Sequence, residues 1–87
     1  SYIFLPEIKK GEKMNLYLVH CGFYDDEISN NVYEFHINLF TAASNQDEAK
    51  ENILNQEIFK KKKMHIDGIQ KISEVSNFQI TLTQKEI

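Results

Sequence analysis

Two pairs, each of an acidic residue and a histidine, are the residues of this sequence best suited to metal binding or acid-base chemistry. Glu34 stands two residues before His36, and His65 stands two residues before Asp67. Side chains two positions apart on a strand point to the same side, so each pair presents an imidazole and a carboxylate together if its segment is extended. Imidazole and carboxylate groups bind zinc, iron or manganese, and three of them leave a coordination position for water. The four residues therefore form a candidate metal- or ligand-binding site.

The same groups have other interpretations, which stay open at this point. His36 oriented by Asp67 or Glu34 could act as a general acid or base, but no nucleophile or cofactor motif accompanies it. The spacing also lacks a tight metal motif such as His-Glu-x-x-His. We therefore favour a polar strand face and a hydrogen-bonded turn over a metal site, and we assign no catalytic residue. The sequence requires no cofactor, although a transition metal would fit.

The first pair lies in the clearest strand pattern of the chain, residues 32–42. Apolar and polar side chains alternate there, which predicts a strand with one face in the core and one polar face. The predicted core face comprises Tyr33, Phe35, Ile37 and Leu39, and the polar face comprises Glu34, His36 and Asn38.

Another strand is predicted over residues 14–20, which are apolar on both faces, as in a central strand. We expect Gly22 to end this strand. Residues 23–31 then form a polar loop, in which the acidic residues 25–27 are interpreted as a solvated turn because they lack the pattern of a calcium loop. The two strands are predicted to pair as a hairpin.

A helix is predicted to begin at Ser44, an N-cap candidate followed by acidic residues. Its apolar stripe comprises Ala49, Ile53, Leu54 and Ile58, and its exposed positions are Lys50, Glu51, Asn52 and Gln56. The lysines at 60–63 complement the dipole at the helix end. We favour a solvated helix end over a polyanion-binding patch here, since the net charge is −3 and aromatic residues do not interleave with the lysines.

Downstream of the helix, residues 65–67 are predicted to be extended. The spacing of Ile66, Ile69 and Ile72 by three residues would also suit a helical turn, so that alternative stays open. We favour a strand because helix propensity is poor around Gly68 and a hairpin signal follows.

The last part of the chain contains two predicted strands, residues 69–75 and 78–83, joined by a turn at residues 76–77. In the second of these, Phe78, Ile80 and Leu82 are predicted to face the core. The complete order is ββαββ, which indicates an α+β fold with a small, mostly antiparallel sheet and one helix packed on one face.

The length of 87 residues suits a single domain, which we place at residues 14–87. Residues 1–13 form an extension before it, with three interpretations: an edge strand, an arm for dimerisation or a vector-derived segment. Met14 is then a candidate natural start. No apolar run approaches the length of a membrane span, so no membrane partner is expected.

Charge and cysteine content restrict the partners and the compartment. The sequence has no arginine, whose planar fork grips phosphates, and its net charge is −3, so nucleic acid is not an expected partner. The single cysteine, Cys21, forms no internal disulfide, which favours a reducing compartment, and we expect the protein to be cytoplasmic. Its neighbour His20 points to the other face of a strand, so Cys21 is interpreted as a small buried hydrophobe and not as a nucleophile.

Three short motifs carry a resemblance to a known family. Tyr17-Leu18 running to Gly22, then Glu34-Phe35-His36, then His65-Ile66-Asp67, resemble the uncharacterised bacterial family called domain of unknown function 1543, from Met14 to about Ile72. The positions that correspond are Gly22, Glu34, His36, His65 and Asp67. The chain departs from the family at Cys21-Gly22, where paired glycines are expected, and at Phe59, where a tryptophan often closes the helix. The resemblance implies a fold and a bacterial source, and it implies no activity.

One helix can cover only one face of the predicted sheet, which leaves the face of Glu34, His36 and Asn38 open. We therefore expect a small, non-enzymatic interaction or structural module that forms a homodimer, through this face or through residues 1–13. The alternative is a metal- or small-ligand-binding domain, with or without enzymatic activity, that uses the two acid and histidine pairs. The identity of a small-molecule ligand is not predicted.

Overall fold

The computed structural model describes residues 13–25 and 33–86. In chain order its elements are β1 (Asn15–Tyr24), β2 (Glu34–Ala43), α2 (Gln46–Leu54), α3 (Glu57–Lys61), β3 (His65–Ile72), β4 (Glu74–Val75) and β5 (Phe78–Gln79). The predicted arm or edge strand lies almost entirely outside the described residues, as does most of the loop between the first two strands. No helix within the described ranges is long and apolar enough to cross a membrane.

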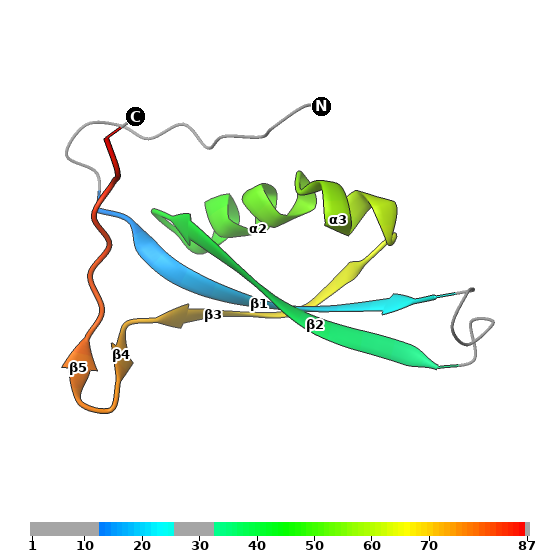
Figure 1. The fold of residues 1–87 in the computed structure, drawn as a ribbon, viewed down its shortest axis with the longest axis horizontal. Coiled ribbons are helices and arrows are strands. Elements are labelled where there is room, and N and C mark those ends of the chain that lie inside the picture. The colour runs from blue at the N-terminus through cyan, green and yellow to red at the C-terminus, as the bar shows by residue number, and fades with distance from the viewer. Residues whose placement is uncertain (1–12, 26–32, 87) are drawn as a thin grey trace.

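The main sheet is antiparallel, with the strand order β2-β1-β3. Figure 1 shows α2 and α3 lying together on one face of this sheet. The predicted α+β class, the antiparallel sheet and the hairpin of the first two strands are therefore confirmed. β1 occupies the centre, as its apolar character on both faces indicated.

The core lies between the helices and one face of the sheet. Alternate residues of β1, namely Tyr17, Val19 and Cys21, are buried there. They pack in two adjoining clusters with residues of β2, the helices and the following turn: Ala43, Ala49, Ile53, Phe59 and Met64. The central strand thus supplies one wall of the core, and the period of two in its side chains leaves the other residues of β1 for the opposite face.

The predicted core face of the second strand is right in part. Ile37 and Leu39 pack against the core, and the ring of Phe35 stacks on Phe23 with a centroid distance of 5.7 Å. Tyr33 was expected beside them and is instead 69% exposed. It precedes β2, which begins at Glu34, so it lies beyond the region where the helices cover the sheet.

Two short helices replace the single one that was predicted. The N-cap is Asn45 and not Ser44, because the Asn45 side chain accepts the hydrogen bond of the Glu48 N–H at 2.8 Å. Ser44 instead donates its hydroxyl to the Glu48 carboxylate at 2.7 Å. The second helix, α3, begins after the break that follows α2 and buries Phe59.

The predicted apolar stripe of the helix is consequently only half buried. Ala49 and Ile53 are fully buried, whereas Leu54 and Ile58 are 40% and 44% exposed. Asn52 was expected on the outside and is buried. Its side-chain amide donates to the Thr41 hydroxyl at 3.1 Å and to the Ala42 carbonyl at 3.0 Å, so it attaches α2 to β2. A buried amide is tolerated because both donors are satisfied.

Residues 65–67 are extended, as favoured, and begin β3. Ile66 and Ile69 both pack against the core although they are three residues apart. A β-bulge explains this spacing, because the pairing register with β1 shifts between His20 and Cys21. The spacing that suggested a helical turn is therefore the signature of a bulged strand.

The predicted C-terminal hairpin forms, but it does not join the core. Ser76 and Asn77 have positive φ angles of 51° and 68°, which suits the tight turn between β4 and β5. The two strands make a separate sheet beyond the end of β3 (Figure 1). Phe78, predicted to face the core, is 74% exposed, and the second strand ends at Gln79.

The acidic segment after β1 also differs from its prediction. Asp25, expected in a solvated turn, is only 7% exposed, and its carboxylate accepts a hydrogen bond from Lys62 Nζ at 3.0 Å. Lys62 is the C-cap residue of α3. One of the four lysines therefore pairs with the residue that follows β1, although the Lys62 side chain stays 38% exposed. Asp26 and Glu27 lie outside the described residues.

Candidate functional site

The candidate site lies on the face of the sheet opposite the helices, which we call the open face. Its residues alternate with the core residues on all three strands. One end of the open face, where β3 begins after α3, is polar. Its residues are His20, Gly22, Glu34, His36, Asn38, His65 and Asp67. Further along it becomes apolar, with Leu16, Leu18, Phe40, Ala42 and Ile72.

Gly22 is the centre of the polar end because of the pairing register. It lies opposite His36 of β2 in one ladder and opposite His65 of β3 in the other. The two histidines therefore flank one glycine in a single row across the sheet. The prediction that the first strand ends at Gly22 is wrong, since β1 continues to Tyr24.

The bulge in β3 brings Asp67 into the same group. Gly22 pairs with His65 and His20 pairs with Gly68, so Asp67 is the additional residue that the bulge inserts. Bulges commonly redirect a side chain in this way next to functional sites. His65 and Asp67 consequently both present their side chains above Gly22.

The four residues predicted as a site lie in one cluster. His65 Nε2 is 2.6 Å from Glu34 Oε2 and 3.3 Å from Asp67 Oδ1. His36 Nε2 is 3.0 Å from Glu34 Oε1, and its Nδ1 is 3.4 Å from Asp67 Oδ2. The two carboxylates thus alternate with the two imidazoles, and each carboxylate directs one oxygen to each histidine.

Gly22 makes room for this arrangement, because a side chain on it would occupy the middle of the cluster. An added Cβ would lie 2.6 Å from His65 Nε2, 2.9 Å from Glu34 Oε2 and 3.0 Å from Asp67 Oδ2. Three donor atoms from two strands therefore surround one point above the central strand. Glycine in a strand interior often marks such a close approach.

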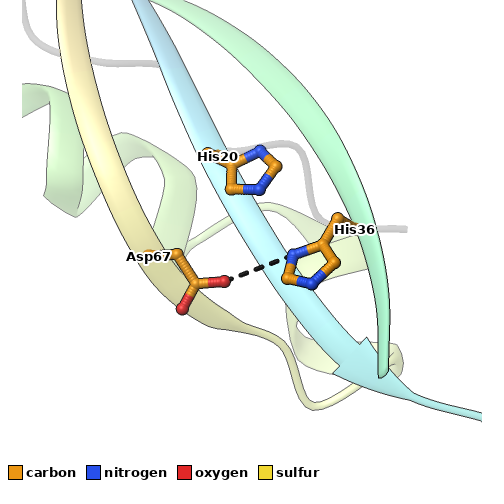
Figure 2. Close-up of side chains that lie close together, drawn as sticks. All are labelled: His20, His36 and Asp67. Atoms are coloured by element: carbon orange, nitrogen blue, oxygen red, sulfur yellow. Dashed lines mark ion pairs between the residues drawn. The ribbon is translucent and has the colours of Figure 1, made fainter. Parts of the chain in front are cut away.

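His20 is a further member of the cluster that the sequence analysis did not include. Its ring stacks on that of His36 with a centroid distance of 4.9 Å and an interplanar angle of 3°. Its Nδ1 lies 2.8 Å from Asn38 Oδ1. Figure 2 shows the two parallel rings and the Asp67 carboxylate beside them. The sequence contains one signal that could have placed His20 in the cluster: His20 and Gly22 alternate with the core residues of β1 and so share the opposite face.

The cluster is accessible from solvent. The side chains of Glu34, His36, His65 and Asp67 are between 31% and 45% exposed. A cavity of about 550 Å³ runs beside β3 and α2, and His65 and Asp67 form part of its wall with Lys50 of the helix. The exposed fractions show that solvent reaches all four side chains, whereas the cavity adjoins only His65 and Asp67 of the cluster, from the side of α2.

Cys21 does not belong to this site. It points to the core face, where it is fully buried. Burial, and secondarily the negative charge of Asp67, raise the pKa of the Cys21 thiol. The thiolate that a nucleophile requires is disfavoured there, in agreement with the interpretation of Cys21 as a small buried hydrophobe.

Comparison with known protein families gives a match. A profile of the family described as a domain of unknown function, number 1543, matches residues 31–82, which is more than half of the chain. The matched segment contains the four predicted site residues, whereas the resemblance was expected from Met14 onwards. No curated protein and no solved structure matches the chain.

Proposed function

The chain belongs to the family of domain of unknown function 1543, and since this membership names no activity, we propose a function from the site itself: the protein binds a divalent transition-metal ion above Gly22. The ligands are Glu34, His65 and Asp67. Their donor atoms all lie within 4.8 Å of one another, which is the observation that carries the proposal.

The charges and protons of the cluster favour a cation at this point. A neutral imidazole has one N–H, yet His65 Nε2 faces two carboxylate oxygens at 2.6 and 3.3 Å. The Glu34 and Asp67 carboxylates share both imidazoles, and a positive ion between the two carboxylates reduces their mutual repulsion. A divalent ion between Glu34, Asp67 and His65 neutralises both carboxylates and accepts the imidazole lone pair.

The ligand types indicate which metal ions are suitable. One nitrogen and two oxygen donors suit zinc, iron(II) or manganese(II), whereas calcium prefers oxygen ligands alone. Three protein ligands leave a coordination position open, and the partial exposure of all three side chains gives water or a small ligand access to it.

His36 has a supporting role towards this ion. Its Nε2 lies 3.0 Å from Glu34 Oε1, while the other oxygen of Glu34 faces His65. A hydrogen bond from His36 thereby orients the Glu34 carboxylate, as groups around metal ligands commonly do. All four residues predicted from the sequence then contribute, three as ligands and one through Glu34.

Calorimetric titration of the full chain with Zn²⁺, on protein purified without a histidine tag, tests this proposal. We expect at least one ion per chain, and His65→Ala should weaken its binding by at least about tenfold. Gln70→Ala is the matched control, because Gln70 is an exposed residue of β3 on the same face. Absence of bound zinc, or equal binding by His65→Ala with an unchanged circular dichroism spectrum, would contradict the proposal.

A second candidate function is the homodimerising module that we expected from the sequence. The apolar end of the open face favours it, since Phe40 is 57% exposed next to Leu18 in the sheet. A second copy of the same surface could cover these side chains by a two-fold arrangement. Light scattering at micromolar concentration should then give a dimer, and Phe40→Ser should give a monomer. A monomeric native chain would exclude it.

A further inference from the structure

The polar end of the open face contains more ligand groups than one ion requires. The second group consists of His20, His36 and Asp67, whose donor atoms also lie within 4.8 Å of one another. It shares Asp67 with the group of Glu34, His65 and Asp67. We propose that His20, His36 and Asp67 bind a second divalent metal ion, so that Asp67 bridges a two-metal centre. This inference rests on the proposed function, because it adds a neighbour to the first ion.

The orientation of Asp67 suits a bridging role. Its Oδ1 faces His65 Nε2 at 3.3 Å, and its Oδ2 faces His36 Nδ1 at 3.4 Å (Figure 2). Each oxygen thus lies near a histidine of a different group, and Oδ2 also lies 3.0 Å from the place of an added Cβ on Gly22, so Asp67 stands between the two groups. A carboxylate that binds one ion through each oxygen holds the two ions close together, and protein two-metal sites have separations of about 3.5–4 Å.

The hydrogen bond of His20 prepares it for metal binding. An amide oxygen only accepts hydrogen bonds, so the Asn38 Oδ1 at 2.8 Å places the ring hydrogen of His20 on Nδ1. In a neutral imidazole with this tautomer, the Nε2 atom of His20 carries the lone pair. Metal-binding histidines generally donate their second ring N–H to such an oxygen, which fixes both tautomer and ring orientation. Asn38 is therefore a positioning residue for His20.

In His36, as in His20, one ring nitrogen can donate a hydrogen bond while the other is free to bind a metal ion. When Nε2 donates to Glu34 Oε1 at 3.0 Å, Nδ1 carries the lone pair and faces the Asp67 carboxylate at 3.4 Å. A lone pair and a carboxylate oxygen repel each other unless a cation lies between them. The parallel stacking of His20 on His36 keeps both rings on the same side of Asp67. A second metal ion resolves the repulsion and uses both lone pairs.

Zinc stoichiometry in the full chain tests the two-metal centre. The native chain should bind two Zn²⁺ ions by calorimetry and elemental analysis, and His20→Ala should bind one, with the remaining affinity unchanged. Asn38→Ala should keep both sites and weaken only the second ion by about 10–100-fold. Gln70→Ala should retain both ions, and circular dichroism checks that each variant folds. If His20→Ala does not fold, the selective effect of Asn38→Ala decides the question.

Electron paramagnetic resonance of the Mn²⁺ form separates a bridged pair from two distant ions. Two ions joined by Asp67 should give a coupled spectrum, and His20→Ala should restore that of an isolated ion. One zinc ion in the native chain, two zinc ions in His20→Ala, or an uncoupled native spectrum would overturn the second site while leaving the proposed function intact. No bound zinc at all would instead overturn the proposed function.

Discussion

At the scale of single residues, the space above Gly22 controls the candidate site. The two edge strands extend their acids and histidines over this position because the central strand has no side chain there. At Gly68, the other described glycine of the sheet, an added Cβ would meet no atom of residues 13–25 or 33–86 within 4 Å. The two glycines therefore provide a matched pair of positions for an experiment.

Gly22→Ala should keep the fold and reduce metal binding. The atoms that the new Cβ meets belong to the ends of His65, Glu34 and Asp67, which can shift, but their movement separates the ligands. We expect zinc affinity to fall by at least about tenfold, a loss of the size seen when groups around a metal site are altered. Calorimetry measures it, and Gly68→Ala serves as the control. Equal affinities in the two variants would show that the space above Gly22 is not the binding position.

Cys21 should be protected from alkylation in the folded protein. Burial first, and the charge of Asp67 second, raise the pKa of its thiol above the ordinary 9.0. Iodoacetamide at pH 8 should therefore react with the unfolded chain much faster than with the native one, as mass spectrometry can measure. Because the unfolded thiol loses its proton first, stability should also decline as pH rises above 9.0. Equal alkylation rates would contradict the burial of this side chain.

At the scale of elements, the register of β1 with its two neighbours assembles the site, and the helices secure the sheet from the other side. The bulge in β3 directs Asp67 to the open face while it keeps Ile66 and Ile69 on the core. The amide of Asn52 connects α2 to the end of β2. The site therefore depends on packing that lies on the opposite face of the sheet.

Asn52→Ala should destabilise the fold by about 1–3 kcal/mol, because it removes two hydrogen bonds and leaves the Ala42 carbonyl without this donor in a partly buried environment. Urea denaturation monitored by circular dichroism gives the free energy of unfolding. The control is Glu51→Ala, an exposed neighbour in α2, whose effect should stay within about 0.5 kcal/mol. Similar losses in both variants would mean that Asn52 does not attach the helix to the sheet.

At the scale of the whole molecule, a small core makes ligand binding important for stability. A domain of this size buries only about 60% of its unfolded surface, so its stability margin is narrow. A metal ion that joins β2 to β3 across β1 would connect the two edge strands of the sheet. Ligand binding to the folded state alone raises its stability in proportion to the logarithm of ligand concentration.

Zinc should therefore raise the melting temperature of the native chain. At a free concentration about 100 times the dissociation constant, the gain is about 2.7 kcal/mol. The gain should disappear as pH falls from about 8 to about 5, because protons compete with the metal for imidazoles and carboxylates. Scanning fluorimetry with and without zinc measures both effects, and a chelator should reverse the first. A melting temperature that is independent of zinc at pH 8 would argue against binding to the folded chain.

The sequence alone indicated much of the fold and four residues of the cluster, but not His20. Strict alternation identified β2, and the loop between two apolar segments identified the hairpin, because both signals depend on neighbouring residues. The inward placement of Phe78 and the outward placement of Asn52 were wrong for one reason. Whether a residue is buried depends on which helix or strand packs over it. That packing is determined by contacts between residues far apart in the sequence.

The same distinction applies to the site. Periodicity by itself determined that Glu34 and His36 share one face of a strand, since side chains two apart always do. Only the tertiary structure decided that Gly22 lies between His36 and His65, that a bulge brings Asp67 to them, and that His20 joins the group. Register and bulges arise from pairing between strands far apart in sequence and from the packing of one sheet face, which no local pattern contains.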